Sequence, residues 1–391
     1  MKRLTHLDWL RGVAVVIMIL WHSMDAWTAP SARHSDAFDF ITLAGGWAAP
    51  LFLFLAGVSV ALAGASFRNA RGAPPPRAAA PRLVDSLDAA AAGATGATAP
   101  PAGALRDAAR LATSWRLQKR GWRVFLLAHL FRLQEFLLDP GAHWSSVLKP
   151  DILNILGLGI VGVAWCWGRA TTAARQVAWL LGPAAAVILL SPGSRGWMWP
   201  TVFRSFAPRV EAYVRPVPGM GVFSAFPWVA FVFVGAFAGM YLVARRTDDG
   251  EPRRQIALML AGGLVAGAGY FGRLLPALSS ESSFWTTSLS FFLIRVGVMV
   301  LLIPVAWAWM HRPTASHWSP LLVFGRTSLF VYWVHVELAY GRVSYPLHAS
   351  LSVRAALLAF AAFTALMLGL AVLWTRLLGS LHSRRIVPVQ N

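Results

Sequence analysis

The chain has 391 residues, of which 57% are hydrophobic and 13% charged, and its mean hydropathy is +0.56. Soluble globular domains carry about 25% charged residues, so this composition excludes an ordinary soluble protein and indicates a polytopic membrane protein. Lys and Arg outnumber Asp and Glu by 35 to 16. Most of the basic residues lie in loops between apolar runs, so membrane topology and lipid headgroups explain them, and we expect no nucleic-acid partner. The single cysteine excludes an internal disulfide.

Apolar runs along the chain predict an all-α polytopic membrane protein with about ten transmembrane helices. Basic clusters lie in the loops, for example Lys2 and Arg3 before the first run and Arg245 and Arg246 after the sixth. In a ten-helix arrangement these clusters fall on one side, so the positive-inside rule predicts that both termini are cytoplasmic. The spans are expected near 12–28, 44–65, 121–138, 151–168, 176–191, 223–244, 255–275, 287–309, 319–340 and 353–378.

The first run is unusual for a membrane span because ionisable residues enter it. Asp8, Arg11, His22 and Asp25 flank an apolar core at 13–20. At about 100° per residue, Arg11 and His22 share one helix face and lie roughly 16 Å apart along the axis, with Asp8 and Asp25 one turn beyond them. Ionisable residues in a span tend to face protein or water rather than lipid, so this face predicts a functional site.

Plainer interpretations of this segment stay open. Arg11 could act only as a cytoplasmic anchor, and His22 only as an interfacial residue beside Trp21. A basic start followed by a short apolar core also fits a cleaved signal peptide, although Asp8 and Arg11 so close to the core argue against it.

Residues 69–104 form a low-complexity insert rich in Ala, Pro, Gly and Arg. Such a composition cannot bury a core, so we expect a disordered cytoplasmic linker within a single domain that covers 1–391.

Polar residues also enter the third and fourth predicted spans. His129, Arg132 and Glu135 lie one turn apart, and Arg132 with Glu135 is expected either as a structural ion pair or as part of a site. Asp151 and Asn154 open the fourth span, where an acidic residue suits a helix start and a site role is the alternative.

Glycines 157, 159 and 162 match the G-x-G-x-x-G pattern of dinucleotide-binding domains. No soluble strand precedes them and the run is apolar throughout, so we expect a close helix-packing face instead. Gly263 and Gly267 are expected to have the same use.

The ninth predicted span carries Tyr332 and His335 one turn apart, with Glu337 near its outer end. A lone histidine in a span is often a satisfied helix–helix contact, and a site role is the alternative.

In the predicted topology, Arg11 lies on the inner side. The residues expected toward the outer side are His22, Asp25, His34, Asp151, Asn154, His335 and Glu337. A histidine beside a carboxylate suits general-base catalysis, with Asp25 holding the tautomer of His22.

Several blocks of this chain carry a resemblance to known families. The spacing Arg11-x10-His22, within LDWLRGVAVVIMILWHSMDAW, resembles the signature of the acyltransferase type three membrane family. Together with SLFVYWVHVEL and the weaker blocks APLFLFLAGVSVAL, KPDILNILGL and FPWVAFVFVG, it is similar to the heparan-α-glucosaminide N-acetyltransferase-like family and its bacterial members. These blocks cover about a third of the chain.

The resemblance implies a multi-pass acyltransferase domain, 1–391, in the bacterial inner membrane. Acetyl-CoA would enter from the cytoplasm and donate its acyl group to a sugar hydroxyl or amine on the outer side. A histidine would deprotonate the attacking group. His22 fits the spacing of the motif, and His34 fits the loop placement seen in the animal members. The expected partners are the lipid bilayer, acyl-CoA and a carbohydrate acceptor, with no metal, and a homo-oligomer is left open.

We expect Arg11, Arg68 and Arg123 to bind the donor's phosphates, because guanidinium groups suit phosphate. The residues expected to bind the acceptor are Asp151, Asn154, His335 and Glu337. The alternative function is a transporter or flippase for a glycan or lipid-linked substrate, with charged residues along a polar pathway, although no inverted repeat relates the two halves. A non-catalytic scaffold is a third interpretation.

Overall fold

The computed structural model describes residues 4–72, 102–138, 143–197, 207–217, 219–244, 250–312 and 318–384, without the side chains at 66–72, 102, 105, 207, 208, 244 and 381–384. Helices dominate this part of the chain, and its only bridge joins Thr28 and Leu351. The predicted all-α polytopic fold is confirmed. The helices are α1 (Thr5–Trp27), α2 (Asp36–Gly45), α3 (Ala48–Gly72), α5 (Ala102–Leu138), α6 (Ile152–Arg169), α7 (Ala173–Leu190), α8 (Ala207–Val214), α9 (Ala225–Ala244), α10 (Glu251–Gly272), α11 (Leu289–Met310), α12 (Pro320–Arg326), α13 (Ser328–Tyr340) and α14 (Val353–Arg384), with short 3-10 turns that include η1 (Pro30–His34) and η2 (Trp144–Leu148).

The number of membrane-crossing helices is close to the predicted ten. Among the described residues, eight helical segments are long and apolar enough to cross a membrane, or nine if the bent pair α12–α13 forms one span. The third predicted span lies in α5, which does not qualify because Arg123, Arg132 and Glu135 lie in its apolar half. Those charges need protein or water beside them, so α5 cannot face lipid on all sides.

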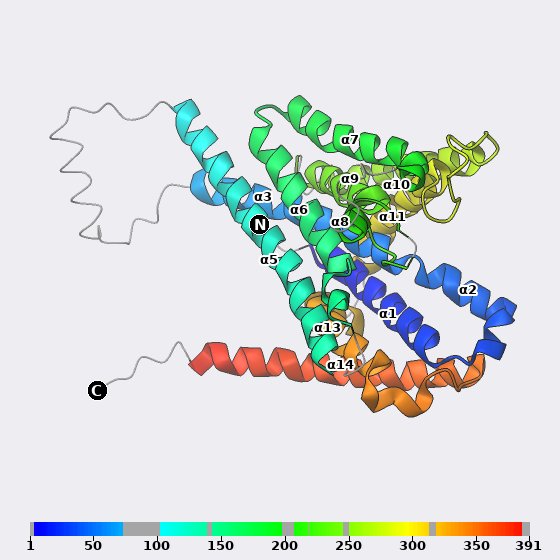
Figure 1. Cartoon of the computed structure of the whole chain (residues 1–391). Coiled ribbons are helices and arrows are strands. Elements are labelled where there is room, and N and C mark those ends of the chain that lie inside the picture. The colour runs from blue at the N-terminus through cyan, green and yellow to red at the C-terminus, as the bar shows by residue number, and fades with distance from the viewer. Residues whose placement is uncertain are drawn as a thin grey trace, which may run out of the picture.

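Different connections lie at the two ends of the helix bundle. The end of α3, the start of α5 and the end of α14 lie toward the left in Figure 1. The η1 turn between α1 and α2 and the connection from α10 to α11 lie toward the right. This arrangement is compatible with the predicted orientation, which stays a prediction.

Reporter fusions on either side of α10 test that orientation. A fusion at Gly250 should report the cytoplasm and one at Glu281 the opposite side, because the basic residues within 245–254 lie just before α10 and in its first turn. Paired fluorescent-protein and phosphatase reporters would measure this. Two fusions on the same side, or Gly250 outside, would contradict the topology.

The predicted ninth span is broken, which is a correction to the sequence analysis. α12 and α13 meet at an angle of 92°, with Thr327 at the junction. The hydroxyl of Thr327 donates to the Val323 carbonyl at 2.8 Å, closing the last turn of α12. The break therefore turns the start of α13 away from the axis of α12.

Glycines bring this break against α1. A Cβ added at Gly12 would lie 1.9 Å from the Leu321 carbonyl oxygen, and one at Gly325 would lie 1.8 Å from that of Asp8. No side chain fits between two backbones at such distances, so the α1–α12 contact requires glycine at both positions. The contact places the end of α12 against Asp8, which lies one helical turn from Arg11 in α1.

The α6 glycines pack as predicted. A Cβ at Gly157 would lie 2.7 Å from the Phe125 nitrogen in α5, and the other two glycines of the motif meet α9 at 2.6 Å and 3.1 Å. The prediction for Gly263 and Gly267 is wrong, since nothing lies within 4 Å of an added Cβ at either residue. Gly262, on a different face of α10, makes the close contact with α11.

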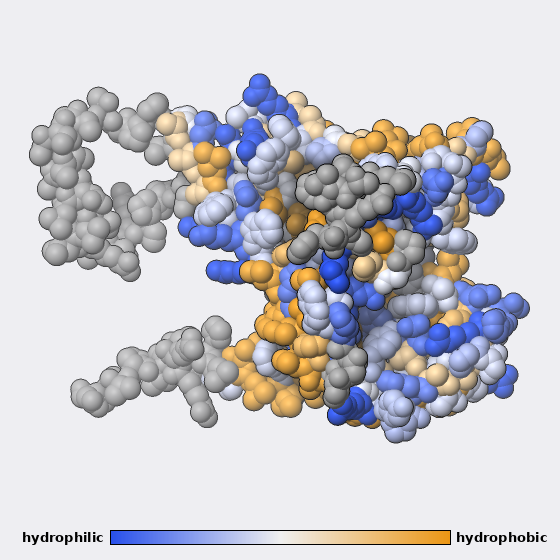
Figure 2. Space-filling view, viewed as in Figure 1, coloured by the Kyte–Doolittle hydropathy of each residue, from blue (hydrophilic) through white to orange (hydrophobic). Residues whose placement is uncertain are grey.

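The outer surface of the bundle is apolar where lipid is expected. Leu264 of α10 and Leu358 of α14 are each 75% exposed, and Figure 2 shows hydrophobic surface over much of α14. Exposed leucines on this scale suit contact with acyl chains. Of the predicted linker 69–104, residues 73–101 lie outside the described part, whereas 69–72 end α3 and 102–104 begin α5.

Candidate functional site

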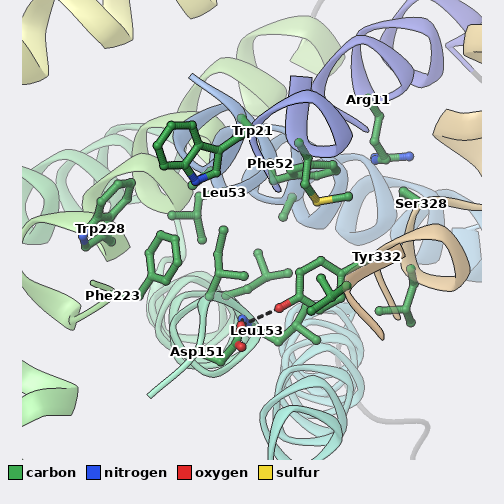
Figure 3. Close-up of a pocket in the computed structure, with 18 of the residues that line it drawn as sticks. Arg11, Trp21, Phe52, Leu53, Asp151, Leu153, Phe223, Trp228, Ser328 and Tyr332 are labelled. Carbon is green, nitrogen blue, oxygen red and sulfur yellow. Dashed lines mark hydrogen bonds between the residues drawn. The ribbon is translucent and has the colours of Figure 1, made fainter. Parts of the chain in front are cut away.

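A cavity of about 2180 Å³ runs through the helix bundle. Its lining along α1 extends from Leu7 to Asp25, which corresponds to about 27 Å on a helix and approaches the thickness of a hydrocarbon core. Ordinary small-molecule sites occupy about 300–1,000 Å³, so there is room for two reactants. In Figure 3, Arg11 and Ser328 lie at one end, Trp228 and Phe223 at the other, and Asp151 and Tyr332 between them.

His22 lines this cavity and is held from behind by a second histidine. Its Nδ1 lies 2.7 Å from Nε2 of His335, and the two rings stack with centroids 5.0 Å apart. Nδ1 of His335 lies 2.7 Å from the Val331 carbonyl oxygen, which can only accept a hydrogen bond. In the neutral pair His335 therefore carries its proton on Nδ1, and its Nε2 accepts from Nδ1–H of His22. This network leaves the lone pair of His22 on Nε2.

Asp25 lies on the same cavity but has other partners. Its carboxylate accepts from the Tyr340 hydroxyl at 2.7 Å and lies 3.8 Å from Nη1 of Arg33. The structure thus gives the position next to Nδ1 of His22 to His335 rather than to the expected Asp25. Asp25 acts on His22 only through its nearby negative charge.

Arg11 lines the opposite end of the cavity. Its guanidinium donates to Asp8 at 3.1 Å and to the Ser59 hydroxyl at 2.7 Å. The side chain of Arg11 is 21% exposed, so these two partners fix its direction while part of the fork still reaches the cavity. Ser59, from α3, was not expected in the site.

Asp151 joins three helices at the middle of the cavity. It caps α6 by accepting from the Leu153 backbone, accepts from the Tyr332 hydroxyl at 2.6 Å and pairs with Arg132 at 3.1 Å. Arg132 also pairs with Glu135 at 2.7 Å, so both predicted alternatives hold: a structural ion pair and a place beside the cavity. The network links α5, α6 and α13 around one carboxylate.

Asn154 completes the α6 cap and does not line the cavity. Its Oδ1 accepts from the Asp151 nitrogen at 2.9 Å, and its Nδ2 donates to the Phe125 carbonyl at 3.1 Å. Nearby, Tyr213 donates to the Leu148 carbonyl at 3.1 Å. Burial raises the pKa of Tyr213 to about 12, so its hydroxyl stays protonated as a donor at neutral pH.

The remaining predicted residues lie away from the cavity. His34 is exposed in η1, and Glu337 and Arg123 do not line the cavity. The side chain of Arg68 lies outside the described residues. The cavity lining instead includes Arg120, Arg295 and Arg326, none of which was predicted as a site residue.

One comparison with known proteins gives a match. A family model described as an acyltransferase domain matches residues 4–83, about a fifth of the chain. The matched region holds α1, α2 and α3, and therefore Arg11, His22 and Ser59. The match supports a multi-pass membrane protein of the acyltransferase type, as expected from the motif. No curated protein matches the chain.

Proposed function

We propose that this protein transfers an acyl group, expected to be acetyl, from cytoplasmic acyl-CoA to a sugar hydroxyl or amine on the outer side of the membrane. The observation that carries the proposal is the shared cavity. It joins Arg11 at one end to His22 at the other, and His335 holds His22 in the tautomer of a base.

In the proposed reaction, the acceptor's oxygen or nitrogen attacks the thioester carbonyl carbon. Its proton passes to Nε2 of His22 as the new bond forms, and the C–S bond then breaks. The departing CoA thiolate takes the proton back from the imidazolium. The charge on His22 is stabilised meanwhile by its hydrogen bond to His335 and by the negative charges of Asp151 and Asp25.

The opposite end of the cavity has the features of a phosphate site. Arg11 and Arg326 line it, together with the first residues of α13 at the α12–α13 break. A helix start offers unpaired backbone N–H groups and a positive dipole end, which favour phosphate. The donor's phosphorylated nucleotide would rest there while its thin pantetheine arm reaches toward His22.

Arg11→Gln should weaken binding of CoA by about tenfold or more, because a charge-assisted hydrogen bond to phosphate is lost. Isothermal titration of the full chain in nanodiscs would measure this. Arg312→Gln, an exposed arginine outside the cavity, serves as the matched control. Equal CoA affinity in a folded Arg11→Gln protein would remove Arg11 from the donor site.

The proposal is tested with purified protein in sealed proteoliposomes. Acetyl-CoA is supplied on the Gly250 side and a sugar acceptor on the other, and free thiol and acetylated sugar are measured. Both products should appear in equal amounts. The cavity reaches toward both faces, so a transporter remains the second candidate. Sugar movement across the bilayer without acetylation would favour it.

A further inference from the structure

We propose that the acceptor carries an anionic group, carboxylate or phosphate, which is bound by Arg295 in the outer part of the cavity. This inference rests on the proposed function and adds the substrate class. Arg295 belongs to α11, lines the cavity and is 9% exposed.

The charge of Arg295 is not matched by the protein. Its Nε atom is buried without a hydrogen-bond partner, and no ion pair joins its guanidinium to a described residue. Two carboxylates that line the cavity already have other partners. Asp151 pairs with Arg132 and accepts from the Tyr332 hydroxyl, and Asp25 accepts from the Tyr340 hydroxyl. Asp39 is exposed and makes no ion pair with Arg295 within the described part. An unpaired buried charge is costly, and intramembrane arginines mark ligand sites.

The surroundings of Arg295 hold it in place for a ligand. Its guanidinium lies 4.0 Å from the centroid of the Phe291 ring and 5.9 Å from that of Trp228. Both rings line the cavity, and Trp228 stands at the end opposite Arg11 in Figure 3. Contact with aromatic rings positions a guanidinium without using its N–H groups, which stay available to an anion. The rings themselves offer apolar faces to the body of the acceptor.

The position of Arg295 matches the reacting end of the cavity. A Cβ added at Gly46 would lie 3.6 Å from its Nη2, and one at the preceding Gly45 would lie 2.8 Å from the ring of Trp21. Trp21 and Arg295 thus flank the same α2–α3 corner, and Trp21 precedes His22 in α1. An acceptor whose anion sits on Arg295 therefore lies on the His22 side of the cavity.

The experiment compares three sugar probes on the full chain in nanodiscs, without any acyl donor: methyl glucuronide, glucose 6-phosphate and neutral methyl glucoside. The wild type should bind at least one anionic probe about 10- to 100-fold more tightly than the neutral one. Arg295→Gln should abolish this preference. Arg273→Gln should keep it, because this exposed arginine removes the same net charge while lying outside the cavity.

Stability provides a second readout. Arg295→Met should leave the thermal midpoint unchanged or raise it, because an unpaired buried charge is replaced by an apolar chain. Equal binding of charged and neutral probes by the wild type, or a preference that survives Arg295→Gln, would overturn the inference. Since no donor is present, anion binding can hold while acyl transfer fails. Conversely, undiminished transfer to anionic sugars by Arg295→Gln would keep the proposed function and remove this inference.

Discussion

His22→Ala is expected to lower acyl-transfer turnover by about 10²- to 10⁴-fold, the usual contribution of a positioned base. CoA affinity should stay near wild type, because the base acts in the transition state and the donor's phosphates bind at the Arg11 end. Turnover is measured as thiol release under saturating acetyl-CoA, and affinity by titration. The cavity wall also includes Asp25, whose carboxylate accepts from the Tyr340 hydroxyl, so water can fill the space that truncation leaves.

His34→Ala is the matched control, since His34 is exposed in η1 and does not line the cavity. It should keep turnover near wild type. If His34→Ala abolishes transfer and His22→Ala leaves it intact, the loop histidine is the base. If neither substitution matters in a preparation that acylates sugars, the histidine mechanism itself is wrong.

His335→Leu should have the second-largest effect, a loss of about 10- to 100-fold in kcat, the size of loss seen when the partner that orients a metal-ligating histidine is removed. Without Nε2 of His335, Nδ1–H of His22 loses its acceptor and the ring can turn or exchange tautomers. His335 is buried behind His22 and does not touch the cavity, so it is a positioning residue. KM for the acceptor should therefore change little.

His335→Gln separates this role from packing, because its amide oxygen can still accept from His22. It should recover much of the lost kcat. Met367→Leu, a nearly volume-conserving change at a residue buried in a neighbouring core cluster, controls for general disturbance of the core. Equal losses in the leucine and glutamine variants, or a change in KM alone, would reassign His335 to a structural contact.

The sequence by itself determined the features that depend on local periodicity. The spacing of Arg11 and His22 placed both residues on one helix face, and the structure has both on one cavity. The helix-start signal of Asp151 and Asn154 also holds, because a capping box forms within four consecutive residues. The α6 glycines were recognised for the same reason, since their face is fixed by the helical repeat.

Tertiary structure alone decided which side chains meet. Asp25 lies one turn from His22, yet the partner of His22 is His335, 313 residues away in the sequence. A carboxylate one turn away binds a histidine only if other groups do not bind that carboxylate first. Here Asp25 accepts from the Tyr340 hydroxyl and lies beside Arg33. The bend at Thr327 and the unpaired charge of Arg295 likewise depend on contacts between distant helices. Helical periodicity is local, whereas partner choice depends on packing across the bundle.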